Sequence, residues 1–96
     1  MILIGKKLLY DYKKEYPDTK SDLDSLEAEI ENAEWKNPHE LKSRYPQASI
    51  IGGRQVIFNI CRNKHRLWVE VTYNIKIVAT VKIGTHKEYD KWEIKK

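Results

Sequence analysis

The sequence has few of the residues that cross-link a chain, bind metal ions or cross a membrane. Cys61 is the single cysteine among 96 residues, so no disulfide can form within the chain. One thiol and three scattered histidines do not make a structural zinc site. No apolar run approaches the roughly 18 residues that a membrane span requires, and the opening Met1–Ile4 is too short for a signal-peptide core. These absences predict a cytoplasmic protein.

Motifs for nucleotide and metal chemistry are missing as well. Gly52 and Gly53 are not followed by the lysine and serine of a phosphate-binding loop, and no ligand spacing suggests a metal. There are no repeats, low-complexity tracts or linkers. At 11.4 kDa the chain has room for one core, so we expect a single domain over residues 1–96 with no cofactor and no metal.

Charge is distributed unevenly around a net value of +4. Residues 1–48 carry 8 lysines and arginines against 10 aspartates and glutamates, a net of −2, whereas residues 49–96 carry 10 against 4, a net of +6. A basic C-terminal half on a small domain is typical of attraction to a polyanion such as RNA. The acidic surface of the first half is expected to repel RNA.

The first half of the chain predicts a short strand followed by two helices. Met1–Ile4 has the composition of a strand, and Pro17 ends a helix over about residues 6–16. A second helix is expected over about 19–34. In both helices apolar residues recur every three to four positions, which gives each helix a stripe to bury: Leu8, Leu9, Tyr12 and Tyr16 in the first, and Leu23, Leu26, Ile30 and Ala33 in the second.

From residue 49 the apolar pattern changes to period two, which is typical of half-buried strands. If Asn63 and Lys64 form a two-residue turn, Ile60 pairs with Leu67 and two strands place six apolar side chains on one face. These side chains are Val56, Phe58, Ile60, Leu67, Val69 and Val71. Residues 36–48, which precede the strands, are predicted as a connection with one helical turn at 39–43.

A third strand is predicted over about residues 76–84, and its facing depends on the loop before it. A three-residue loop at 73–75 turns Ile77, Ala79, Val81 and Ile83 toward the core. A two-residue turn or a bulge reverses this facing, so both arrangements stay open. In the first arrangement the other face of the sheet is basic and aromatic, and it carries Asn59, Arg66, Trp68, Thr80 and Lys82.

The order of these elements predicts an α+β fold. It runs strand, two helices, three strands and a short C-terminal helical turn. Two helices then pack on one face of a small, mainly antiparallel sheet. The opposite face of the sheet is left open to a partner.

The segment from Gly84 to Trp92 has the highest density of groups that handle protons and phosphates. If residues 86–92 form a helical turn, His86, Tyr89 and Asp90 lie three and four positions apart and share a face. Histidine titrates near neutral pH and a neighbouring Tyr or Asp can orient its ring, so this spacing supports proton transfer. A capped terminal turn with Tyr89 packed and His86 merely exposed explains the same residues without a function.

A second basic cluster, Arg62, Lys64, His65 and Arg66, lies at the first hairpin. Loop charges are usually only solvated, which is the simplest interpretation of the first three residues. Arg66 differs because it is predicted on the open face of a strand, where a guanidinium can hold a phosphate through two hydrogen bonds. Trp68 beside it either stacks a nucleobase, a contact of about 1–3 kcal/mol, or packs beneath a loop.

Three motifs lie on this framework: Val56-Ile57-Phe58-Asn59-Ile60, Arg66-Leu67 and, most specific, Gly84-Thr85-His86-Lys87-Glu88-Tyr89-Asp90-Lys91. With the order of elements they resemble the HigB toxins of bacterial toxin–antitoxin pairs, of the RelE-like superfamily. The resemblance extends over essentially the whole chain. It implies an mRNA interferase that cleaves messenger RNA on the translating ribosome. It also implies a partner, a HigA-like helix-turn-helix antitoxin. The toxin would reach operator DNA only through this antitoxin.

The resemblance further implies a metal-independent reaction in which the ribose 2′-hydroxyl attacks the adjacent phosphate. We expect Arg66 to stabilise the charge that grows on the phosphate, and His86 with Tyr89 to transfer the protons, either one being acid or base. Six further residues are expected to assist: Lys64, Trp68, Lys82 and Lys87 by binding RNA, and Asn59 and Asp90 by orienting groups or supporting the structure.

Two other functions stay open at this point. A non-catalytic module would bind RNA or the ribosome through the same basic face and inhibit translation by occupancy alone. A ParE-like inhibitor of DNA gyrase would act through a protein target, and it has no need for acid–base groups such as His86 and Tyr89. New mRNA 5′ ends after induction of the protein separate cleavage from occupancy.

Overall fold

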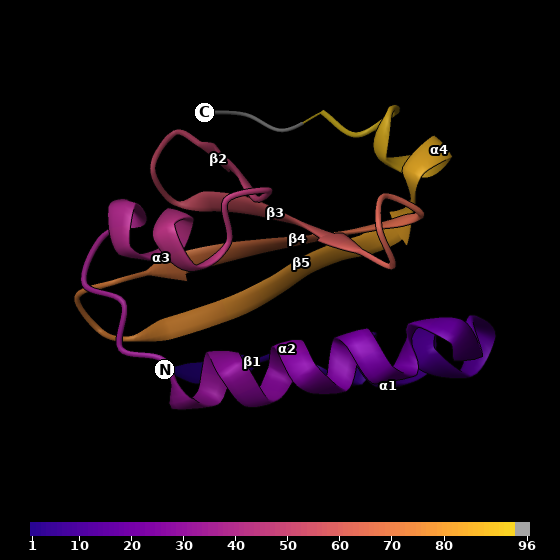
Figure 1. The fold of residues 1–96 in the computed structure, drawn as a ribbon, viewed down its shortest axis with the longest axis horizontal. Coiled ribbons are helices and arrows are strands. Elements are labelled where there is room, and N and C mark those ends of the chain that lie inside the picture. Colours follow the sequence, from indigo (N-terminus) through magenta and orange to yellow (C-terminus); the bar gives the residue numbers. More distant parts are fainter. Residues whose placement is uncertain (94–96) are drawn as a thin grey trace.

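The computed structural model describes residues 1–93, which form one sheet with helices on both faces (Figure 1). The strand order is β1-β5-β4-β3-β2, and all neighbours are antiparallel except β1 and β5, which are parallel. This confirms the α+β fold with a small, mainly antiparallel sheet. The elements are β1 (Ile2–Ile4), α1 (Lys6–Glu15), a 3₁₀ turn (Pro17–Thr19), α2 (Lys20–Asn32), α3 (Pro38–Arg44), β2 (Ser49–Ile51), β3 (Gln55–Ile60), β4 (His65–Thr72), β5 (Ile77–Thr85) and α4 (His86–Tyr89).

The helices α1 and α2 cover one face of the sheet, and α4 lies on the other side at the end of β5 (Figure 1). Most of the apolar stripes predicted for α1 and α2 is buried against the sheet, with Leu9 and Ile30 almost completely inaccessible to solvent, but Leu8 is half-buried and lies outside the core cluster. Lys13 joins the two helices by ion pairs of 2.6 Å to Asp24 and 3.0 Å to Glu27. Each large apolar side chain that is fully buried here stabilises the fold by about 1.5–3 kcal/mol.

The connection between α2 and β2 contains a longer helix than expected. Asn37 caps α3 because its side-chain oxygen accepts a hydrogen bond of 3.0 Å from the Glu40 backbone N–H. Leu41 and Trp35 are buried and close one end of the core. No helix within residues 1–93 is long and apolar enough to cross a membrane.

The β3–β4 hairpin has a four-residue loop at 61–64 instead of the two-residue turn that we predicted. Ile60 therefore pairs with His65, and Phe58 pairs with Leu67, so the predicted register was wrong by two residues. Because side chains alternate between faces with period two, a shift of two leaves every side chain on its expected face. All six apolar side chains of the hairpin are buried in the core as predicted.

Two departures from the predicted geometry of β5 cancel each other. The loop before β5 has four residues, 73–76, so Val78 faces the core and Ile77 and Ala79 do not. A bulge then leaves Val81 unpaired, because Trp68 pairs with Lys82 while Val69 pairs with Thr80. Beyond the bulge Ile83 faces the core, as predicted.

The bulge decides which polar side chains of β5 reach the open face of the sheet. Thr80 lies on the helix side, contrary to expectation, and its hydroxyl donates a hydrogen bond of 2.9 Å to the Gly5 carbonyl. Lys82 lies beside Trp68 on the open face, as the three-residue loop had predicted. The basic side chain was thus placed correctly, although the loop length behind that placement was wrong.

The interpretation that the hairpin charges are only solvated is wrong for His65, because only 4% of this residue is exposed. Its Nδ1 lies 2.7 Å from the Tyr12 hydroxyl and its Nε2 lies 3.4 Å from Asp18. The Tyr16 ring packs edge-on against the imidazole at 5.1 Å between centroids. Burial raises the pKa of Tyr12 above its usual value, so this hydroxyl stays protonated.

Replacing Tyr12 by Phe should lower the free energy of unfolding by about 1–3 kcal/mol, because a buried imidazole nitrogen loses its partner. The matched control is Tyr10→Phe, which alters an exposed tyrosine of the same helix and should change stability by less than about 0.5 kcal/mol. Urea denaturation measures both values. Equal stability of the two variants would contradict the buried hydrogen bond.

Candidate active site

Hydrogen bonds at the N-terminus of the helix α4 attach it to the end of the sheet. Thr85 accepts a hydrogen bond of 3.2 Å from the Glu88 N–H through its hydroxyl, and Glu88 accepts one of 2.9 Å from the Thr85 N–H. The His86 N–H donates to the Lys64 carbonyl at 2.9 Å. The motif Thr85–Tyr89 therefore encodes a capping box, and the β3–β4 loop holds the start of α4.

Arg66 and His86 come from different elements and converge on the Tyr89 ring. The Arg66 Cζ lies 5.3 Å from the ring centroid, and the His86 ring lies edge-on at 6.4 Å between centroids. Asp90 places a carboxylate oxygen 3.6 Å from His86 Nδ1. The local spacing of His86, Tyr89 and Asp90 is as predicted from the helical turn, and the tertiary structure adds the guanidinium to it.

Arg66 is largely enclosed, with 8% of the residue exposed. Its Nη1 donates a hydrogen bond of 3.2 Å to the His65 carbonyl. Within residues 1–93 the hydroxyl of Tyr73 is the one fully buried side-chain polar atom that lacks a partner. The guanidinium is thus held in a fixed position between β4 and the Tyr89 ring.

Trp92 belongs to this site, although the sequence analysis gave it no role. Its ring lies 5.6 Å from Tyr89 and 6.1 Å from Trp68 between centroids, and the Lys82 Nζ lies 5.9 Å from its centroid. The signal was its spacing of three residues from Tyr89, which places both on one side of a helical turn. The aromatic face therefore consists of Trp68, Tyr89 and Trp92.

Gly84 is the position that allows Trp92 to lie against the sheet. A Cβ at residue 84 would lie 3.0 Å from the Trp92 Cζ2 and 3.2 Å from the Glu88 Cβ. Gly84 also pairs with Arg66 across β4 and β5. The missing side chain thus makes room for the aromatic ring directly beside the guanidinium.

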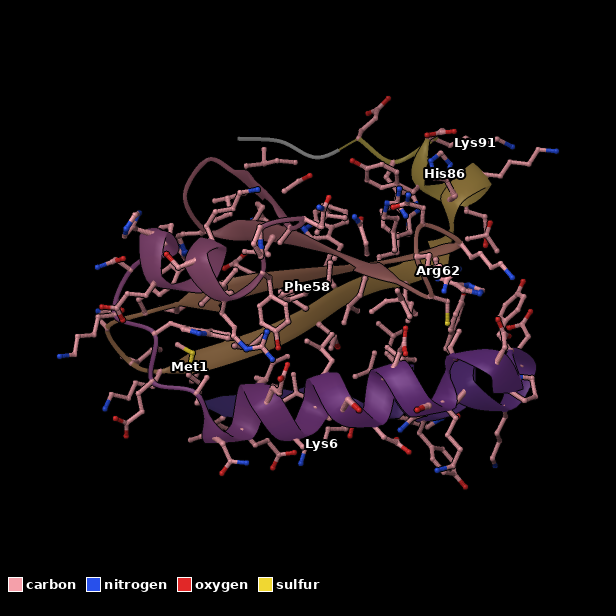
Figure 2. All side chains as sticks on the ribbon, in the orientation of Figure 1. Met1, Lys6, Phe58, Arg62, His86 and Lys91 are labelled. Atoms are coloured by element: carbon pink, nitrogen blue, oxygen red, sulfur yellow. The ribbon has the colours of Figure 1, made fainter. Side chains whose placement is uncertain are left out.

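The remaining predicted residues lie around this centre. Asn59 is the pairing partner of Arg66 on β3, and its side-chain amide donates to the Gln47 carbonyl at 3.3 Å. Lys64 and Lys87 are exposed, one on the β3–β4 loop and one on α4. Figure 2 shows His86 on α4 above Arg62, which belongs to the β3–β4 loop. No group of three or more His, Cys, Asp or Glu residues within 1–93 is placed to hold a metal ion.

This combination of a five-stranded α+β fold with a basic, aromatic face at α4 corresponds to a class of small bacterial toxins. Residues 19–92 match a family described as the RelE-like toxic component of a toxin–antitoxin system. The chain belongs to this family, the HigB toxins, as the resemblance had implied.

Curated relatives of the chain carry the same family name. It is 30% identical over 92 residues to the mRNA interferase toxin HigB of Escherichia coli strain K12, with 94% of this chain and 88% of the relative covered. The mRNA interferase HigB of Escherichia coli O157:H7 and that of Shigella flexneri match to the same extent.

Replacing Gly84 by Ala should move Trp92 and lower the free energy of unfolding by about 1–3 kcal/mol, because the added methyl group overpacks the contact. In ¹H–¹⁵N spectra the indole N–H signals of Trp68 and Trp92 should shift, while that of Trp35 in the core stays in place. Val81→Ala, an exposed change on the same strand, is the control. Unchanged indole signals of Trp92 would contradict the close contact.

The capping box predicts a pH dependence of α4. The hydrogen bond from the Thr85 backbone N–H holds the pKa of Glu88 below its usual value. A carboxylate with a lowered folded pKa stabilises the fold above its unfolded pKa of about 4.3, and this contribution is lost as pH falls through the folded pKa. The Thr85 amide signal should titrate with a midpoint below about 4.3, and the transition should vanish in Glu88→Gln. A midpoint at or above the usual value would contradict the capping box.

Proposed function

We propose that this HigB family member is an mRNA interferase, an endoribonuclease that cleaves messenger RNA by attack of a ribose 2′-hydroxyl on the adjacent phosphate. The observation that carries the proposal is the convergence of Arg66 and His86 on the Tyr89 ring, at a basic face that α1 and the acidic α2 leave open. The printed names of the curated relatives support it, since each is called an mRNA interferase.

The reaction needs a proton acceptor, a proton donor and a cation at the phosphate. As the O2′–P bond forms and the P–O5′ bond breaks, one of His86 and Tyr89 takes the 2′ proton and the other protonates the departing 5′ oxygen. The products are a 2′,3′-cyclic phosphate and a 5′-hydroxyl end. Arg66 neutralises the charge that develops on the phosphate oxygens, and Asp90 orients the imidazole from 3.6 Å.

The aromatic face supplies affinity for single-stranded RNA. Trp68 and Trp92 offer stacking surfaces, each worth about 1–3 kcal/mol per base, and every base has a face that can stack. Lys82 beside Trp92 lies close enough to pair with a phosphate of the stacked nucleotide. Lys64 and Lys87 add positive charge at the two sides of α4, which attracts the RNA backbone.

We propose that the ribosome holds the mRNA in the in-line geometry that the isolated chain does not provide. Positioning two reactants contributes about 7–11 kcal/mol in favourable cases, so a modest acid–base pair suffices when the mRNA is held in line. The protein then acts in the cytoplasm as a single RelE-like domain over residues 1–96. A HigA-like helix-turn-helix antitoxin neutralises it, and the pair reaches operator DNA through that antitoxin.

Cleavage should be lost when either converging group is removed. His86→Ala or Arg66→Ala should reduce the appearance of new mRNA 5′ ends after induction by on the order of 10²–10³, because each removes a proton-transfer or electrostatic group. His39→Ala, an exposed histidine on α3, is the matched control and should cleave normally. Circular dichroism confirms that each variant is folded, and Arg66→Lys separates loss of charge from loss of packing.

Two results would overturn the assignment. New 5′ ends at the normal level from both folded variants would show that the site lies elsewhere. Growth arrest by the unaltered protein without any new 5′ ends would show that it inhibits translation by occupancy alone.

A further inference from the structure

A cleft of about 520 Å³ opens beside the candidate active site, and none of the proposed catalytic groups lines it. It forms because β2 is shorter than β3. The first residue of β2, Ser49, pairs with Ile57, so β3 continues past β2 and the chain before Ser49 turns away. The side-chain amide of Asn59 bridges the gap to the Gln47 carbonyl. A cleft of this volume is large enough for one nucleotide, since small-molecule sites range from about 300 to 1,000 Å³.

The polar side chains that line the cleft are suited to a nucleotide. They are two guanidinium groups and three carboxamides, with no carboxylate among the lining residues: Arg44, Arg62, Gln47, Asn59 and Asn63. Carboxamides donate and accept hydrogen bonds, so they can read the edge of a base, and a guanidinium suits a phosphate. The apolar part of the lining includes Tyr45 and Phe58, whose rings pack edge-on at 5.1 Å.

Arg62 is the cation that remains available to a ligand in this cleft. Arg44 is paired with Glu29, which also accepts a hydrogen bond from the Tyr45 hydroxyl. Arg62 is exposed and has no ion-pair partner in the part of the chain that the structure describes. A second hollow that Arg62 lines also contains Asp18, Asp22 and Lys64, so its charges balance, whereas the cleft has no carboxylate in its lining and attracts a phosphate more strongly.

The loop that presents Arg62 has an unusual backbone conformation. Cys61, Arg62 and Asn63 all have positive φ, at 50°, 63° and 121°, although none of them is glycine. Non-glycine residues held in sparsely populated backbone regions often cluster at ligand sites. Asp22 holds the loop from α2 through a 2.9 Å hydrogen bond from the Cys61 N–H. The loop therefore presents Arg62 and Asn63 to the cleft from a fixed frame.

The cleft adjoins the proposed active site directly. Asn59 and Arg66 are pairing partners on neighbouring strands, which lie about 4.8 Å apart in a sheet. The same loop that carries Arg62 and Asn63 also accepts the first hydrogen bond of α4 through Lys64. An RNA strand with its reacting phosphate at Arg66 can continue over β3 into the cleft.

We infer that this cleft binds a nucleotide of single-stranded RNA that neighbours the reacting phosphate, with Arg62 on its phosphate and the carboxamides of Asn59, Asn63 and Gln47 on its base. This inference rests on the proposed function, and it adds a site that determines which RNA sequences are cleaved. Arg62 and the carboxamides bind and select; they take no part in proton transfer.

Binding is tested with a 2′-O-methyl hexaribonucleotide of mixed sequence, in which the attacking hydroxyl is blocked. On addition of this RNA, the side-chain amide signals of Asn59, Asn63 and Gln47 should shift in ¹H–¹⁵N spectra. Arg62→Ala should weaken the affinity roughly tenfold, because one charge-assisted contact to phosphate is lost. Arg54→Ala, which removes an exposed arginine paired with Glu70, is the matched control and should bind normally. Shifts confined to β4 and α4, with equal affinity of Arg62→Ala, would overturn the inference.

Cleavage specificity gives a second readout that is independent of the catalytic groups. Mapping of mRNA 5′ ends after induction of Gln47→Ala should show cleavage that continues with an altered preference for the nucleotides beside the cut. An unchanged preference in both Gln47→Ala and Arg62→Ala would count against the cleft, while cleavage itself would leave the proposed function intact. Binding in the cleft without any cleavage by the unaltered protein would instead refute the proposed function and leave the cleft standing.

Discussion

The absence of a side chain at Gly84 is the constraint on which the candidate site depends. Because a Cβ there would lie 3.0 Å from the Trp92 ring, any larger residue would push back the segment that folds over the sheet after β5. This return brings the Tyr89 ring over Arg66, which pairs with Gly84 in the neighbouring strand. The capping box of Thr85 and Glu88 sets the direction of α4 at the same point. Sheet, helix and reacting groups are therefore positioned by one short contact region.

The acidic residues of α2 and the basic residues of the second half of the chain lie on different sides of the sheet and have different roles. The acidic residues of α2 act largely within the protein: Asp24 and Glu27 pair with Lys13, Glu29 pairs with Arg44, and Asp22 holds the β3–β4 loop. The basic residues of the second half reach the other face and its edge. An RNA strand thus meets a positive surface, while the negative charges of α2 support the loop and the cleft from behind.

Two errors in the predicted strand geometry left the side chains of the open face where they were predicted, and each outcome has a physical reason. A hairpin register that moves by two residues changes no facing, since side chains alternate with period two. In β5 a loop that is one residue longer reversed the facing, and the bulge at Val81 restored it before Lys82. Apolar periodicity predicts which side chains share a face, but it carries little information on loop length. Arg66 and Trp68 were for this reason placed on the open face correctly, whereas Lys82 lies there because the bulge offset the longer loop.

The sequence alone determined the fold class, the core stripes and the local set of His86, Tyr89 and Asp90, because these follow from periodicity and from spacing within one helical turn. Only the tertiary structure decided the enclosure of Arg66, the burial of His65 against Tyr12, the place of Trp92 and the cleft at Asn59. Each of these depends on contacts between segments that are distant along the chain. Such contacts are set by loop lengths, a bulge and the room left by one glycine, which no local pattern in the sequence reveals.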